Sequence, residues 1–175
     1  MGRRLLVLAF SVLTLSGAVT RSDRSETRSP ALPGAQEVDV VALVVDERTN
    51  QPSMVLQGKR DHRNLYMVIG FAEATGIAAP LQGITPPRPL THDLFLTLFG
   101  RLKVGVTRVV IHDLKDGVYY ATLVLSIDGK EVPLDARPSD GIALAIRAKA
   151  PVYVEDQVFD KSSAPVPLAQ PPNRL

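Results

Sequence analysis

Residues 106–149 read VTRVVIHDLKDGVYYATLVLSIDGKEVPLDARPSDGIALAIRAK, a stretch that contains clear signals for strands, turns and a helix. Its first half contains two runs of mainly β-branched, aliphatic and aromatic residues, Val106–Leu114 and Val118–Ile127. Such runs favour β-strands. The residues between them, Lys115-Asp116-Gly117, are a turn signal because glycine adopts the positive φ that tight hairpins require. The pattern therefore predicts a β-hairpin.

A third strand and a helix are predicted directly after this hairpin. Asp128-Gly129 forms a second tight turn, which leads into a short strand at Glu131–Asp135. The sequence Pro138-Ser139-Asp140 then begins a helix, and apolar residues recur at helical spacing from Ile142 onward. The stretch as a whole therefore predicts three antiparallel strands followed by one helix.

The chain before this stretch has the same order of elements. The predicted strands are Val38–Val45, Ser53–Leu56 and Leu65–Ile69. A helix rich in small residues is predicted over 71–83. Pro80 has no N–H for the helical hydrogen-bond ladder, so we expect this helix to kink or end near Ala79.

A connecting helix and a final strand complete the predicted elements. Thr91–Leu102 is the clearest helix, because its leucines and phenylalanines recur at helical spacing and Thr91 is a natural N-cap. Pro151–Val154 reads as a last short strand. The repeated order of three strands and a helix predicts an α+β domain with a duplicated unit. We expect one strongly curved sheet with helices packed on it.

The two ends of the chain carry targeting and linker signals. Residues 1–20 combine a basic start, an apolar run and small residues, which predicts a signal peptide and export to the periplasm or the medium. The run is shorter than the roughly 20 apolar residues of a membrane span, so no membrane association is expected after cleavage; an uncleaved anchor is the alternative. Residues 21–36 are predicted to be a linker and 162–175 a disordered proline-rich tail. The folded domain is therefore expected at 37–161.

The sequence pI near 9.0 gives no support to a basic nucleic-acid-binding surface. The whole chain has net charge +2, but residues 37–161 contain 14 Lys and Arg against 16 Asp and Glu, which gives −2. The basic excess lies in the terminal segments. The chain also has no cysteine, which excludes disulfides, thiolate metal ligands and a thiol nucleophile.

Two short polar stretches carry dense chemistry in this otherwise apolar chain. Arg88–Leu94 (RPLTHDL) ends a proline-rich loop and begins a helix, and Asp135–Asp140 (DARPSD) ends a strand and begins another helix. Helix N-termini attract anions. Arg88 and Arg137 could each hold a phosphate through two parallel hydrogen bonds.

The acids and the histidine of these stretches suggest hydrolysis. Asp93, Asp135 and Asp140 offer the oxygen ligands that Mg²⁺ or Mn²⁺ prefers. His92 can act as a general base or as a further ligand. Together with the arginines, these groups are the components of metal-assisted phosphodiester hydrolysis.

Structural roles would explain the same residues. Thr91 and Ser139 are good N-caps, and Asp93 and Asp140 stand where acids favour the helix dipole. The arginines could simply pair with nearby carboxylates such as Asp135. Each stretch taken alone therefore leaves the structural and the functional interpretation open.

Several of these motifs together resemble one known family, the bifunctional nucleases of bacteria and plants. The motifs are IGFAEATGIA at 69–78, RPLTHDL at 88–94, RVVIHDLKDGVYYATL at 108–123 and DARPSDGIALAIRAKAPVYV at 135–154. The resemblance covers about residues 38–160. It implies duplicated β3α repeats that form a barrel-like sheet, a homo-oligomer, and nuclease activity on DNA and RNA.

The chemistry of the side chains at the matching motif positions gives the candidate functional residues. We expect His92, Asp93, Asp135 and Arg137 to be catalytic, and Arg88, Thr91 and Ser139 to bind substrate. Asp93, Asp135, Asp140 and Glu73 would hold a Mg²⁺ or Mn²⁺ ion. Two departures from the family pattern, Gly141 and Pro80, are expected to loosen the helices near the site.

Two functions are therefore weighed. The first is an exported, divalent-metal-dependent nuclease that hydrolyses DNA, RNA or both. The second is a non-catalytic module that binds an anionic ligand or mediates oligomeric interaction.

Overall fold

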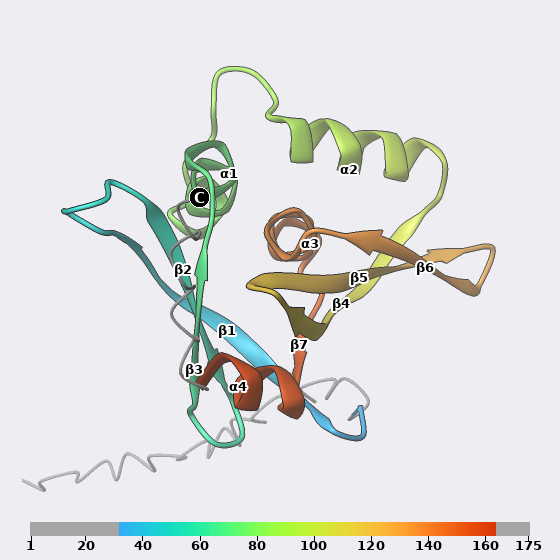
Figure 1. Cartoon of the computed structure of the whole chain (residues 1–175). Helices are drawn as coiled ribbons and strands as arrows, with labels where there is room; N and C mark the ends of the chain where they lie inside the picture. The colour runs from blue at the N-terminus through green and yellow to red at the C-terminus, as the bar shows by residue number, and fades with distance from the viewer. Residues whose placement is uncertain (1–31, 164–175) are drawn as a thin grey trace, which may run out of the picture.

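The computed structural model describes residues 32–163, which form a seven-stranded sheet and four helices (Figure 1). The strands are β1 (Ala35–Val45), β2 (Pro52–Gly58), β3 (Asn64–Val68), β4 (Gly105–Lys115), β5 (Val118–Ile127), β6 (Lys130–Ala136) and β7 (Val152–Glu155). The helices are α1 (Phe71–Leu81), α2 (Thr91–Arg101), α3 (Pro138–Ala148) and α4 (Asp156–Ser163). The α+β class is confirmed, and α4 is the one element that the sequence did not predict.

The predicted terminal segments fall largely outside the described residues. The signal peptide at 1–20 lies wholly outside them, as do residues 21–31 of the linker and 164–175 of the tail. Within residues 32–163, none of the helices is long and apolar enough to cross a membrane.

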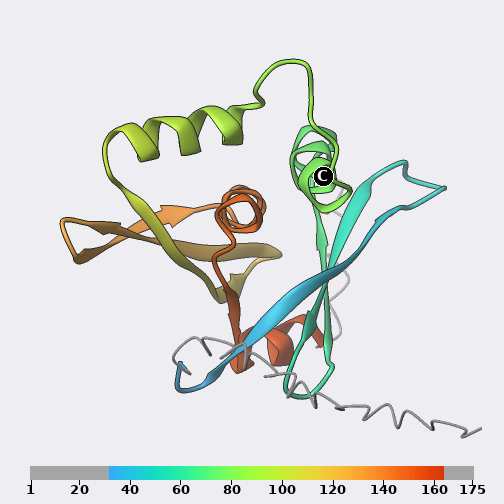
Figure 2. The same ribbon diagram turned by 180° about the vertical axis from the view of Figure 1, so that it is seen from behind.

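The sheet is built from two antiparallel three-stranded arms that meet at β7. Its strand order is β3-β2-β1-β7-β4-β5-β6, and β7 pairs antiparallel with β1 and parallel with β4. Register irregularities in β1 and β4 interrupt the ladders, which is how strands bend. Figures 1 and 2 show the two arms inclined to each other on either side of β7.

The sheet is curved, as predicted, but it does not close into a barrel. Closure would need the edge strands β3 and β6 to pair, and they do not. Instead, the Tyr119 hydroxyl of β5 donates a hydrogen bond to the backbone carbonyl of Tyr66 on β3, at 3.1 Å. Helices α1 and α3 contact each other and also pack on their own arms, α1 on β2 and α3 on β4 and β5. The order of three strands and a helix occurs twice, as predicted; that the two units are duplicates stays a prediction.

Helix α3 is the most deeply buried helix and fixes the position of one polar stretch. Seven of its residues are buried, among them Ile142 and Ala145. A Cβ at Gly141 would lie 3.1 Å from Cγ1 of Val109 on β4, so glycine allows the helix to approach the sheet closely. Gly141 therefore tightens this packing, and the expectation that it loosens the helix is wrong.

Pro80 also has a different consequence from the one expected. Helix α1 continues through Pro80 and ends at Leu81. Proline cannot donate to the carbonyl oxygen of Gly76, four residues earlier. The guanidinium of Arg147 donates to that oxygen instead, at 2.6 Å. The hydrogen bond that replaces the missing helical one therefore joins α1 to α3.

Candidate functional site

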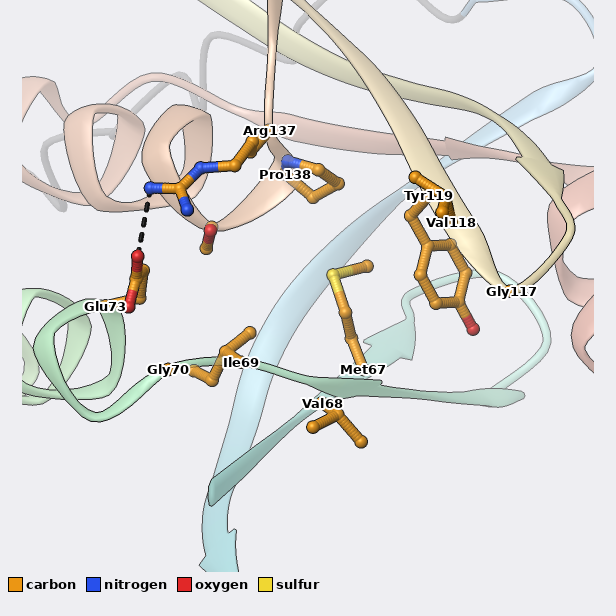
Figure 3. A pocket seen from close by; sticks show the side chains of 11 residues that line it. Met67, Val68, Ile69, Gly70, Glu73, Gly117, Val118, Tyr119, Arg137 and Pro138 are labelled. Carbon is orange, nitrogen blue, oxygen red and sulfur yellow. Dashed lines mark ion pairs between the residues drawn. The ribbon is translucent and has the colours of Figure 1, made fainter. Parts of the chain in front are cut away.

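The arginine that precedes α3 is the centre of the candidate site. Arg137 is the N-cap residue of that helix, and its side chain is 66% exposed. Its guanidinium donates to Asp140 from Nε at 2.6 Å and from Nη2 at 3.1 Å. Nη2 also lies 2.9 Å from Oε1 of Glu73, the third residue of α1 (Figure 3). The hydrogen bonds that Arg137 donates to Asp140, together with the charges of Asp140 and Glu73, raise the pKa of Arg137, which therefore stays cationic. One cation thus joins two carboxylates from different helices.

His92 brings the second polar stretch to the same place. It is the second residue of α2, and its Nε2 lies 3.6 Å from Oδ1 of Asp140. Its side chain is only 13% exposed. A Cβ at Gly76 of α1 would lie 2.9 Å from Cε1 and 3.0 Å from Nδ1 of the ring. The imidazole therefore packs on the glycine with one edge and presents Nε2 to Asp140.

Asp93, by contrast, is held by the protein through both carboxylate oxygens. Oδ2 accepts from the backbone N–H of Leu90, the residue before α2, at 2.8 Å. Oδ1 accepts from Nε of Arg147 at 2.6 Å. The hydrogen bond from Arg147 is the main reason that the pKa of Asp93 is lowered below 3.8. These contacts make Asp93 a positioning residue at the start of α2.

Arg147 is the residue that sequence reasoning missed. Its side chain is 8% exposed, and besides Asp93 it donates to the backbone carbonyls of Gly76 and Ala143. It thereby ties α1, α2 and α3 together beneath the candidate site. In the sequence it looks like an ordinary basic residue in the last turn of a helix. The available signal was Pro80, which leaves a carbonyl without its helical donor.

The remaining predicted residues are found in different settings. Thr91 is exposed and is the first residue of α2, and Leu90 takes the N-cap position that was expected for Thr91. Ser139 is buried and lies within the first turn of α3, so it is not the N-cap either. Arg88 and Asp135 are exposed, and neither has a hydrogen bond or ion pair with another side chain within residues 32–163. They are therefore available to a ligand.

Arg137 lines three neighbouring cavities. The central cavity, of about 420 Å³, is lined by Glu73, Gly76, Thr91, His92, Arg137 and Asp140, among others. The apolar cavity, of about 490 Å³, shares four of these residues and continues to Phe95, Phe99, Leu123, Leu134, Asp135 and Leu144. The strand-side cavity, of about 300 Å³, lies toward Met67 and Tyr119, as Figure 3 shows, and Ser139 also lines it. A single arginine therefore faces most of the concave surface in this region.

The acids fit a metal ion only in part. Among residues 32–163, no three His, Asp or Glu side chains are grouped so that they could hold an ion by themselves. Glu73 and Asp140 converge on one guanidinium, whereas Asp93 bonds to Arg147. Mg²⁺ is commonly held by one or two carboxylates together with water and substrate phosphates. Glu73 and Asp140 suit an ion that binds jointly with a phosphate.

Comparisons with known proteins place these residues in a family context. The family model described as "Bifunctional nuclease domain" matches residues 54–167. The chain is 40% identical over 131 residues to uncharacterised proteins from two strains of Mycobacterium tuberculosis, covering 75% of this chain and 78% of each relative. It is 32% identical over 85 residues to bifunctional nuclease 1 of Oryza sativa subsp. japonica, covering 47% of this chain and 26% of the rice protein. Because the family model spans more than half of the sequence, the chain belongs to the bifunctional nuclease domain family.

Proposed function

We propose that this chain is an exported, divalent-metal-dependent nuclease that hydrolyses phosphodiester bonds of DNA, RNA or both at the central cavity. The observation that carries the proposal is the exposed guanidinium of Arg137 between Glu73 and Asp140, with Nε2 of His92 beside Asp140. A cation for phosphate, two carboxylates and a general base thereby surround one cavity. Its family membership adds support, because plant relatives carry the name bifunctional nuclease.

Arginines bind and orient the substrate in this proposal. The guanidinium of Arg137 can donate to two phosphate oxygens, because its planar fork matches phosphate geometry. Its present partners, Glu73 and Asp140, keep it aimed at the cavity until a phosphate arrives. Arg88, on the loop before α2, contributes a second positive charge to the approach of the polyanion. Thr91 offers its hydroxyl at the cavity wall.

His92 moves the proton. Nδ1 faces α1, so Nε2 is the atom that accepts a proton from the attacking water. The oxygen of that water forms the new bond to phosphorus, the bond to the leaving sugar oxygen breaks, and that oxygen takes a proton from solvent. Asp140 lies beside the same Nε2 and stabilises the imidazolium once that atom has taken the proton, and the imidazolium then releases the proton to solvent. When bound by Glu73 and Asp140, a divalent ion would lower the pKa of water and offset the charge that develops on the phosphate.

Metal dependence gives the first test. The full chain should nick plasmid and degrade single-stranded RNA with Mg²⁺ or Mn²⁺, and a chelator should stop both reactions. Glu73→Gln should raise the metal concentration needed for half-maximal rate by about tenfold, in the range seen when groups that support a metal are changed. Turnover that continues unchanged in excess chelator would contradict the metal requirement.

The packing of His92 on α1 gives a second test. Gly76→Ala places a methyl group within 3 Å of the imidazole and forces the ring to move. Alanine favours helices over glycine by about 1 kcal/mol, so α1 itself should not weaken. We expect kcat to fall by about 10–100-fold, the scale of an ångström of misplacement, with little change in Tm. Gly100→Ala is the matched control, because no heavy atom lies within 4 Å of its Cβ position. Equal rates for the two variants would remove His92 from the mechanism.

The alternative is that the same arginines bind an anionic ligand without turnover. It is favoured by the exposed guanidinium group of Arg137 at the cavity and by the exposed Arg88 on the loop before α2. Thermal stabilisation of the chain by a nucleotide or inorganic phosphate, with no cleavage of plasmid or RNA under any metal condition, would select this alternative. The predicted homo-oligomer is part of the proposal and is tested by light scattering on the same preparation.

A further inference from the structure

The apolar cavity beside the proposed site has no role in the phosphate chemistry described so far. It is lined by residues of α2, of the strands β5 and β6, and of α3. Thr91, His92, Arg137 and Asp140 line both it and the central cavity, so the two cavities adjoin at Arg137. A ligand bound to Arg137 can therefore extend into it.

The walls of this cavity suit a flat apolar ring. Phe95 and Phe99 stand one turn apart on α2, with ring centroids 6.0 Å apart in an edge-to-face arrangement. Leu123 and Leu134 line the same cavity from the sheet. Phe95 is 47% exposed, so its ring has unoccupied surface to offer. Aromatic residues are few in this chain, yet two of its five phenylalanines line this one space.

Asp135 adds a polar group to the rim. This carboxylate lines the apolar cavity, is exposed, and has no hydrogen bond or ion pair with another side chain in the described part of the chain. A carboxylate is an acceptor only, so it favours a ligand that presents N–H donors. An acyl chain offers none, whereas the edges of nucleobases do.

We propose that the apolar cavity is a nucleobase pocket, which holds the base of the nucleotide whose phosphate is bound by Arg137. This inference rests on the proposed function, because it takes the anion at Arg137 to be a nucleic-acid phosphate. The base stacks on Phe95 and donates an N–H to Asp135. A pocket for one base also limits the class of substrate that the site can take.

That class is single-stranded nucleic acid. A base in a duplex is stacked on its neighbours and paired, so it must be extruded before it can enter a pocket, at an energetic cost. A single strand offers its bases with less cost. The chain should therefore prefer single strands over duplexes of the same sequence.

The test measures binding of a fluorescent 12-nucleotide single strand to the full chain by anisotropy, with chelator present so that no cleavage is needed. Phe95→Ala should weaken binding by about tenfold, as is usual for the loss of one stacking aromatic. Leu98→Ala is the matched control: it lies on the same helix, is 48% exposed and does not line the cavity, so its Kd should stay within about twofold of the wild type. An abasic strand of equal length should bind the wild type and Phe95→Ala equally weakly.

The outcomes separate this inference from the proposed function. Metal-dependent cleavage by a chain whose Phe95→Ala variant binds as the wild type does would overturn the base pocket and leave the nuclease in place. Base-dependent binding that needs Phe95, in a chain that cleaves nothing, would support the pocket and overturn the nuclease. Equal binding of the normal and the abasic strand by the wild type would overturn the pocket. Tighter binding of anionic phospholipid vesicles than of the single strand would assign the cavity to lipid and would also overturn the base pocket.

Discussion

Arg147→Met is expected to lower the free energy of unfolding by about 2–4 kcal/mol, the largest stability loss in the region of the site. The substitution keeps most of the side-chain volume but removes the donors to Gly76, Ala143 and Asp93. The carbonyl of Gly76 then has neither this donor nor a helical one, because Pro80 follows four residues later. Urea unfolding at neutral pH measures the loss.

Arg101→Met is the matched control for this prediction. Arg101 is exposed in the last turn of α2 and makes no ion pair with another side chain within residues 32–163, so its loss should change stability by less than about 0.5 kcal/mol. Equal effects of the two substitutions would show that the contacts of Arg147 do not hold the three helices together.

The stability lost in Arg147→Met should also depend on pH, in a defined direction. The pKa of Asp93 is below its unfolded value of 3.8, chiefly because Arg147 donates to it. Its contribution to stability is therefore fully present above that value and is lost as the pH falls through the lower, folded-state pKa. The difference in stability between the wild type and Arg147→Met should thus be constant near neutral pH and shrink below about pH 4.

Arg137→Met is expected to lower kcat/KM for single-stranded nucleic acid by at least about 100-fold, the scale of losing a preorganised donor to developing charge. The side chain is largely exposed and its main partners are the carboxylates of Glu73 and Asp140. Exposed ion pairs contribute little to stability, so Tm should change by only a few degrees. The kcat/KM of Arg137→Lys should fall between those of the wild type and Arg137→Met, because lysine keeps the charge but cannot form the paired hydrogen bonds.

Much of the fold followed from local patterns. The hairpin at Lys115-Asp116-Gly117, the helix at Thr91 and the helix at Pro138 all appear where turn signals and helical spacing predicted them. Residues at positive φ confirm the turn, because Asp116 and Gly117 have φ values of 50° and 77°. Sheet closure was not accessible to this reasoning, because it depends on whether two edge strands far apart in the sequence meet.

The sequence predicted which polar stretches lie together but not which charged side chains pair. The stretches that contain His92 and Arg137 do come together, as the shared polar chemistry suggested. The partners of each charge could not be read from spacing: Asp93 bonds to Arg147, 54 positions away, and Arg137 reaches Glu73 on another helix. Such pairings are set by how α1, α2 and α3 pack, which no local pattern encodes.

A nuclease site centred on Arg137 is tested by the rate of metal-dependent cleavage of one fluorescent single-stranded oligonucleotide by the wild type, Arg137→Met and Arg101→Met, purified in parallel. We predict turnover by the wild type and by Arg101→Met at equal rates, and a loss of at least about 100-fold in Arg137→Met with its fold intact. Cleavage by Arg137→Met at the wild-type rate, or no cleavage by any of the three proteins, would contradict a nuclease site centred on Arg137.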